Sequence, residues 1–216
     1  MSDARPPLSF SERAFIKALI PLSNFSEGFW IDFGEEIVRT HGITGFFKWA
    51  KLTDDIRREL EADVGVMHHH LLGAFSSLLN GCDYCGFGNL YAFNLLWLKK
   101  HDELFPIAEF ESRRLLRMSY DEFRAEIESA LASEKYQKER EMLLRQFDLK
   151  LHRAKPEGKD DEVLLLSLRL YDFINECSIV TNAPAPPLGK VAKDKKLRKA
   201  YRETRPLPEH FADEEI

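Results

Sequence analysis

The chain of 216 residues has little cysteine, no long apolar run and no excess of positive charge. Three cysteines are an odd number and too few for a disulfide framework, so a close pair of them points to redox or metal chemistry in a reducing compartment. No segment approaches the roughly 20 consecutive apolar residues that a membrane-spanning helix requires. The first twenty residues also lack the continuous apolar segment of a secretory signal. We therefore expect a cytoplasmic protein that does not bind a membrane.

The charge balance also excludes a class of partner. The formal net charge is -5 and the isoelectric point is near 5.9, whereas proteins that bind nucleic acid usually present a basic patch. We expect no nucleic-acid partner. Seven Lys or Arg residues do lie between Lys190 and Arg202, after a proline-rich segment. Because the chain as a whole is acidic, we interpret residues 186–216 as a solvated polar tail that docks on a neighbouring subunit.

No part of the sequence alternates at period two for long, whereas apolar residues recur at helical spacing along most of the chain. We therefore predict an all-α fold, with Ser11 and Ser26 as N-caps of the first two helices and Gly42 as a stop. We divide the chain into an N-terminal helical extension (1–44), a main helical domain (45–185) and a polar C-terminal tail (186–216). The expected helices cover residues 10–21, 25–40, 53–80 and 82–101, then one or two between 119 and 153, and a buried one over 160–180.

Cys82 and Cys85 form a Cys-x-x-Cys motif at the start of a predicted helix, just after the turn at Asn80-Gly81. Unpaired N–H groups and the helix dipole favour a thiolate at that place, and such a pair can cycle between dithiol and disulfide. Asp83, in the same turn, opposes thiolate formation by its own charge, so the direction of the net pKa shift stays open. The simpler alternative is two buried cysteines that act as small hydrophobic side chains.

A histidine and an amide are expected next to the cysteines. In an antiparallel helical hairpin that turns at Gly81, His70 and Asn89 fall at similar depth on the two facing helices. Both would then line one pocket together with Cys82 and Cys85. At that position the imidazole would act as acid or base near pH 7 and the amide as an uncharged hydrogen-bond partner. Without the cysteines, a core histidine satisfied by a neighbour would be the more ordinary interpretation of His70.

A zinc site is a second interpretation of the same residues, because the cysteine pair and one histidine would supply three ligands. Structural zinc generally needs four, and Cys177 lies in a separate apolar helix where we expect a buried thiol. We therefore expect no metal and no organic cofactor. His68 and His69 point away from the face of His70, which predicts positions at the surface or at a subunit contact.

The segment HLLGAFSSLLNGCDYCGFGN resembles the AhpD-like superfamily (alkylhydroperoxidase D and carboxymuconolactone decarboxylase), in which a helix ends in Asn-x-Cys-x-Tyr-Cys. That motif has a Glu twelve residues before the first Cys and a His four residues after the second. Here His70 and Asn89 stand at these two positions. REMLLRQFDLKLHRAKP and LYDFINECSIV are similar to later helices of the family, although Asn175-Glu176 replaces a common Asn-Arg pair. The resemblance covers roughly residues 45–185.

The resemblance implies an all-helical subunit in a homo-oligomer and, in the redox branch of the family, reduction of peroxides or disulfides. It implies Cys85 as the attacking thiolate and Cys82 as the resolving thiol. The substrate would be a small hydroperoxide or disulfide, and a separate thiol would be the reductant. With the family's Glu and His replaced, His70 either supplies the proton transfer from the other side or the cysteines are left poorly activated.

Three hypotheses about function follow. The first is a thiol oxidoreductase in which Cys85 attacks, Cys82 resolves and His70 shuttles protons. The second is a non-catalytic binding or interaction protein of the same fold. The third is a lactone-type enzyme of the decarboxylase branch, in which the cysteines are incidental. Formation of a Cys82–Cys85 disulfide under mild oxidation separates the first from the second, and activity that survives loss of both cysteines favours the third.

Overall fold

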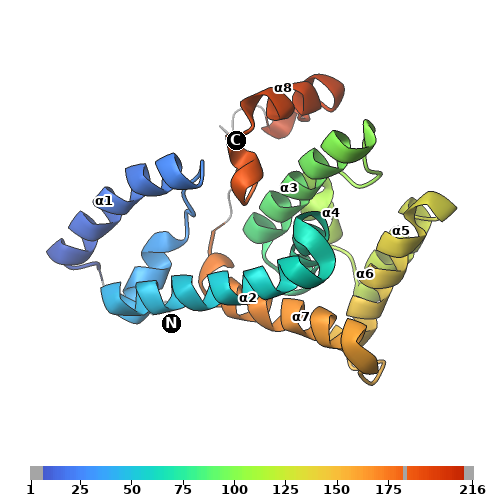
Figure 1. The fold of residues 1–216 in the computed structure, drawn as a ribbon, viewed down its shortest axis with the longest axis horizontal. Coiled ribbons are helices and arrows are strands. Elements are labelled where there is room, and N and C mark those ends of the chain that lie inside the picture. The colour runs from blue at the N-terminus through green and yellow to red at the C-terminus, as the bar shows by residue number, and fades with distance from the viewer. Residues whose placement is uncertain (1–6, 182–183, 212–216) are drawn as a thin grey trace.

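The structure is a computed structural model that describes residues 7–181 and 184–211, and within these ranges it is all-α, without a strand (Figure 1). The all-α prediction is confirmed. Among the described residues no helix is both long and apolar enough to cross a membrane. The helices are α1 (Phe10–Ser26), α2 (Gly34–Leu79), α3 (Asp83–His101), α4 (Ser112–Leu115), α5 (Tyr120–Ala130), α6 (Gln137–Lys150), α7 (Gly158–Ser178) and α8 (Lys195–Thr204).

The first two helices differ in their ends from the prediction. The N-cap of α1 is Ser9, which forms a capping box with Glu12, and not Ser11. The helix continues through Ser26, so Ser26 is not an N-cap and the second helix begins only at Gly34. The expected stop at Gly42 is a kink inside α2, because its φ of 69° interrupts the helix without ending it.

The expected long helix over 53–80 also contains a kink. At Gly65 the backbone has φ 80° and ψ 157°, which interrupts the ladder of main-chain hydrogen bonds. The carbonyl of Val64 accepts a hydrogen bond from the ring Nδ1 of His68, over 3.2 Å. A side chain therefore satisfies a carbonyl at the kink.

The core surrounds the C-terminal half of α2 and the first three turns of α3. All residues from 68 to 79 and from 84 to 95 are buried, so these two segments are covered on every side. Two glycines allow the close approach: a Cβ at Gly73 would lie 2.2 Å from the Tyr171 hydroxyl on α7, and one at Gly86 would lie 2.5 Å from Leu78. These two glycines thus let α2 contact α7 and α3 directly.

The C-terminal segment corrects the prediction of a solvated tail. Residues 184–211 fold back on α3, where Tyr201 and Phe211 join the buried cluster of Phe87 and Tyr91. Leu197 and Tyr201 lie four residues apart on α8 and form its inner face, which the many lysines around them obscure in the sequence. The described part of the tail is therefore a packed element of the same chain.

An ion pair anchors α8. The carboxylate of Glu109, which is fully buried, accepts hydrogen bonds from the Tyr201 hydroxyl at 2.5 Å and from the Arg202 guanidinium. Asn94 on α3 also donates to it, over 3.3 Å. A buried carboxylate needs such partners because it has lost its hydration. This segment of basic residues thus uses one of its cations inside the molecule.

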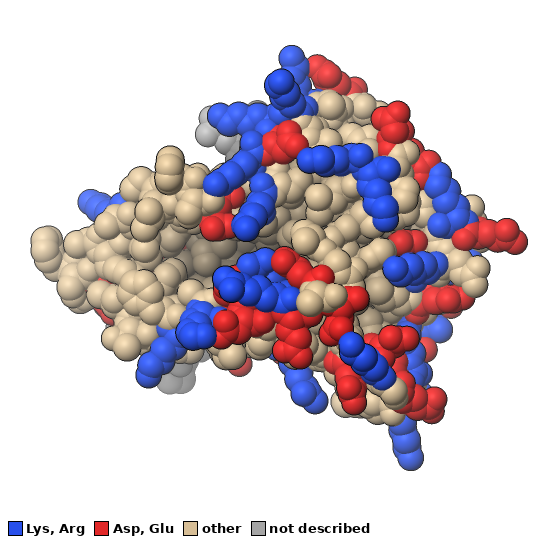
Figure 2. Space-filling view, viewed as in Figure 1, with Lys and Arg blue, Asp and Glu red and all other residues tan. Residues whose placement is uncertain are grey.

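Charged side chains are spread unevenly over the surface. On the face shown in Figure 2, Lys and Arg alternate with Asp and Glu over the right and lower parts of the molecule. The end that carries α1, on the left in Figures 1 and 2, is mostly uncharged. That end therefore differs in character from the rest of the visible surface.

Candidate active site

The cysteine pair lies at the N-terminus of α3, directly after the Asn80-Gly81 turn. Cys82 is the N-cap residue, and its sulfur accepts a hydrogen bond from the backbone N–H of Cys85 over 3.5 Å. Both thiols are free and buried. The hydroxyl oxygen of Ser178, at the end of α7, lies 3.2 Å from each sulfur. One hydroxyl therefore connects the two thiols.

The hydrogen bonds around Ser178 determine where its proton points. Asn175 accepts from the Asn80 amide at 2.9 Å through Oδ1, so it presents its own Nδ2 to the Ser178 oxygen at 3.0 Å. The thiol of Cys85 donates to the same oxygen. A hydroxyl has two acceptor positions and one proton, and here both acceptor positions are filled. The proton of Ser178 therefore points to the sulfur of Cys82.

The two thiols differ in acidity for the same reason. The neighbouring Cys85 side chain, together with hydrogen bonds from Ser178 and from the Cys85 N–H, lowers the pKa of Cys82 in spite of its burial. Burial, together with the neighbouring sulfur of Cys82, raises the pKa of Cys85 well above its usual range. The resemblance implied Cys85 as the attacking thiolate, whereas hydrogen bonding and acidity both favour Cys82.

Asp83, whose charge opposes a thiolate at Cys82, has its own partners. Its carboxylate accepts hydrogen bonds from the Ser112 hydroxyl at 2.6 Å and from Nε of Arg113 at 2.9 Å. The guanidinium of Arg113 also lies over the ring of Phe211, 4.8 Å from its centre. The negative charge beside the cysteine pair is therefore balanced by a cation that the C-terminal segment covers.

His70 and Asn89 meet as the sequence predicted. Nδ1 of His70 lies 2.9 Å from Oδ1 of Asn89, which also accepts from the Tyr171 hydroxyl at 3.1 Å, so the ring nitrogen is the donor. The amide nitrogen of Asn89 donates to the backbone carbonyl of Cys85. Burial lowers the pKa of His70, although the bond to Asn89 partly opposes this.

These contacts do not make His70 a direct proton shuttle. Its bond to Asn89 continues to a main-chain carbonyl, which holds no transferable proton, and not to either sulfur. On its other side, a Cβ at Gly189 would lie 2.9 Å from Nε2 of His70. We conclude that His70 and Asn89 position Cys85, while Ser178 is the hydroxyl that touches both sulfurs.

The neighbouring histidines correct a further expectation, because His68 and His69 are buried and not at the surface. His68 contacts the Glu139 carboxylate at 2.8 Å. The ring of His69 packs between those of His70 and Tyr171, and burial lowers its pKa well below the usual value. Across residues 7–181 and 184–211, no three His, Cys, Asp or Glu side chains gather in an arrangement suited to a metal.

Sequence reasoning missed the contribution of α7 to the site. Tyr171, Asn175 and Ser178 form one polar stripe at helical spacing, and each hydrogen-bonds the cysteine pair or the asparagines beside it. The signal was present, since polar residues at i, i+4 and i+7 in an otherwise apolar helix indicate a buried polar contact. The partner of that stripe was not evident before the helices were placed.

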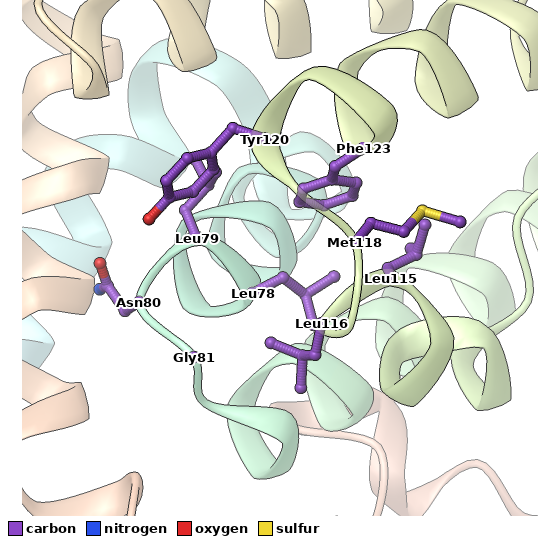
Figure 3. A pocket seen from close by; sticks show the side chains of 9 residues that line it. All are labelled: Leu78, Leu79, Asn80, Gly81, Leu115, Leu116, Met118, Tyr120 and Phe123. Carbon is purple, nitrogen blue, oxygen red and sulfur yellow. The ribbon is translucent and has the colours of Figure 1, made fainter.

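A cavity of about 270 Å³ lies beside the Asn80-Gly81 turn, which precedes Cys82, and is open to solvent (Figure 3). Asn80 and Gly81 form one side of it, and Figure 3 shows the apolar side chains opposite them. Asn80 is also the first member of the hydrogen-bonded chain that leads through Asn175 to Ser178. The lining carries no charged side chain and consists of Leu78, Leu79, Asn80, Gly81, Leu115, Leu116, Met118, Tyr120 and Phe123.

No protein-family model, curated protein or solved structure matches this chain. The likeness to the AhpD-like superfamily therefore rests on the Asn-x-Cys-x-Tyr-Cys motif and the helices around it.

Proposed function

We propose that this protein is a thiol oxidoreductase that reduces small hydroperoxides or disulfides through Cys82 and Cys85. The observation that carries the proposal is the hydroxyl of Ser178, which lies within hydrogen-bond distance of both sulfurs and directs its proton to Cys82. Purely structural cysteines in an apolar core need no such network. The free thiols also suit a reducing compartment, which supports a cytoplasmic location.

In the proposed reaction with a hydroperoxide, the thiolate of Cys82 attacks one peroxide oxygen and the O–O bond breaks. The leaving alkoxide takes up a proton from solvent, which gives an alcohol and a sulfenic acid on Cys82. The Cys85 sulfur then attacks that of Cys82, so that a disulfide forms, the S–O bond breaks and water leaves with the Cys85 proton. A separate dithiol reduces the disulfide and is itself oxidised.

Substrate must reach sulfurs that are buried. The cavity beside Asn80 and Gly81 adjoins the residue that precedes Cys82, and we propose it as the way of approach. Its uncharged lining suits a neutral substrate, because a charged group would lose its hydration there without gaining a partner. A small movement of the exposed Gly81 turn would open the thiols to it.

The test is mass spectrometry of cysteine peptides after one equivalent of an organic hydroperoxide. We expect a Cys82–Cys85 disulfide in the wild type, a sulfenic acid on Cys82 in Cys85→Ser, and a reduced Cys85 in Cys82→Ser. His70→Ala should change the rate of the first step, oxidation of Cys82, little, because the imidazole does not touch sulfur. Thiols that stay reduced in the wild type would refute the activity. A sulfenic acid on Cys85 would refute only the order of the two cysteines.

The second candidate is a non-catalytic binding protein, which the complete burial of both sulfurs favours. In that case the cavity would bind a small neutral ligand and the hydrogen bonds around Ser178 would serve only stability. This reading predicts that peroxide leaves both thiols intact, while Ser178→Ala lowers the melting temperature. The same peptide experiment therefore separates the two candidates.

A further inference from the structure

The helix α1 has two apolar faces, and the residues that the structure describes cover only one of them. Ile16 is buried against the first part of α2, with Phe15, Leu19 and Ile20 partly buried beside it. An ordinary surface helix is polar on the opposite face. In α1 the opposite face instead carries an exposed apolar stripe, spaced by three or four residues: Phe10, Ala14, Ala18, Pro21, Leu22 and Phe25.

The exposure of this stripe is large. Phe10 is 81% exposed and Phe25 is 85% exposed, and Phe47, which packs edge-on against Phe15 of α1, is 55% exposed. With roughly 200 Å² for a phenylalanine, these three side chains alone offer about 450 Å² of apolar surface. The largest apolar patch on a monomeric protein is typically about 300–600 Å² and is often an interaction site. Figure 2 shows the same end of the molecule to be mostly uncharged.

The two largest side chains of the stripe, Phe10 and Phe25, stand at its ends, and the small Ala14 and Ala18 lie between them beside Pro21 and Leu22. In an antiparallel pair of α1 helices related by a two-fold axis near Ala18, Phe10 of one copy would face Phe25 of the other. The small residues near the axis would let the two backbones approach closely.

Charge permits the same pairing. Residues 10–52 contain five acidic and five basic side chains, so this region is neutral although the whole chain carries a charge of -5. Two copies that meet through it are not held apart by their net charge. Two copies of this surface, each with about 450 Å² from Phe10, Phe25 and Phe47 and a further share from Pro21 and Leu22, also approach the roughly 1,000 Å² that a specific interface needs.

We propose that the Phe10 to Phe25 face of α1 binds the same face of a second copy of this chain, so that the protein is a two-fold symmetric dimer. The proposal is independent of the thiol chemistry, because the stripe shares no residue with the cysteine site. The proposal assigns the surface through which the chain associates with itself.

The first test is sedimentation velocity of the full chain at micromolar concentrations, with Ala18→Glu as the variant. Ala18 is exposed and glutamate is a good helix former, so the fold should persist. We expect a dimer of twice 25.1 kDa for the wild type, and a dimer dissociation constant raised roughly 100-fold or more in Ala18→Glu. The matched control is Ala125→Glu, which places the same change on an exposed position of α5.

The second test is cross-linking. Cys introduced at Ala18 lies near the proposed axis and should give a disulfide-linked dimer under mild oxidation, whereas Ala125→Cys should not. A monomeric wild type would overturn the proposal, and so would a dimer that Ala18→Glu leaves intact. Binding of a monomeric wild type to lipid vesicles, abolished by Ala18→Glu, would assign the stripe to a membrane surface and also overturn it.

Discussion

The two halves of α2 differ in how completely the chain covers them. From residue 68 to residue 79 every side chain is buried, and the helix lies among α3, α6 and α7. From Gly34 to Leu52 the helix packs against α1 on one side and, through Trp49, against Phe173 of α7 on another, while Phe47 and Leu52 remain exposed. The difference shows that the described residues enclose the cysteine pair by themselves, whereas the N-terminal part leaves apolar side chains exposed, on the surface that we propose binds a second copy.

If the cysteine pair next to the covered half of α2 carries out the reaction, Cys82→Ser should have the largest effect on activity. We expect peroxide turnover to fall by roughly a factor of 1,000 or more, because a hydroxyl at that position is not ionised near neutral pH. Steady-state consumption of an organic hydroperoxide with a dithiol as reductant measures this. Cys177→Ala is the control, a third buried thiol that should be dispensable. Equal loss in both variants would mean that unfolding, not chemistry, is responsible.

The same comparison predicts unequal costs for two phenylalanines of α2. Phe75 is fully buried and stacks on Phe123, with ring centres 5.8 Å apart, so Phe75→Ala should lower the free energy of unfolding by about 3–5 kcal/mol. Phe47→Ala should cost less than about 1 kcal/mol, because that side chain is mostly exposed. Urea unfolding followed by circular dichroism, at a concentration that keeps the oligomeric state fixed, measures both. Similar losses would contradict the contrast between the two halves.

A smaller effect is expected where α8 closes over α3. Arg202→Ala leaves the buried carboxylate of Glu109 with Tyr201 and Asn94 alone. We expect a loss of about 2 kcal/mol, below the 3–5 kcal/mol of a fully buried pair, because Arg202 is partly exposed. Lys199→Ala, on the exposed side of α8, should change almost nothing. If both variants unfold like the wild type, the segment is not an integral part of the core.

The smallest effect concerns pH. Ser178→Ala removes a hydrogen bond that lowers the pKa of Cys82, so the pKa of this thiol should rise toward its ordinary value. At neutral pH the thiolate fraction then falls, and the reaction with peroxide slows by a few-fold at most but recovers as pH increases. Thiolate absorbance near 240 nm against pH, in a background that carries both Cys85→Ser and Cys177→Ala, follows Cys82 as the one remaining thiol. A titration curve that moves to lower pH would contradict the assigned direction of the Ser178 proton.

Much of the fold was predictable from local pattern. The helix over Asp83–His101, its start at the cysteines and the contact of His70 with Asn89 follow from apolar spacing and from the turn at Gly81. The kinks of α2 were harder, because a glycine with positive φ ends one helix and merely bends another, according to what packs beyond it. The prediction of a solvated C-terminal tail was wrong because it rested on the many lysines of this segment and not on Tyr201, which is buried.

The sequence was sufficient to identify the two cysteines of the site, but not the residues that surround them. Spacing identifies Cys82 and Cys85, but the order of their acidity depends on Ser178, which lies 93 residues after Cys85. The burial of His68 and His69 likewise depends on α6 and α7, which cover sides of α2 that a single helix pattern leaves undetermined. Long-range partners of this kind are set by tertiary packing and not by local sequence.

The segment that follows α7 has a consequence for the order of events during synthesis. Ala185 belongs to the same buried cluster as the two cysteines, and Gly189 lies against the ring of His70. A ribosome makes these residues about a hundred positions after Cys85. Until they emerge, the growing chain carries its thiols without their final cover. The newly made protein therefore passes through a period in which its cysteines are open to oxidants and to other thiols, and that period ends when the segment around Ala185 and Gly189 docks.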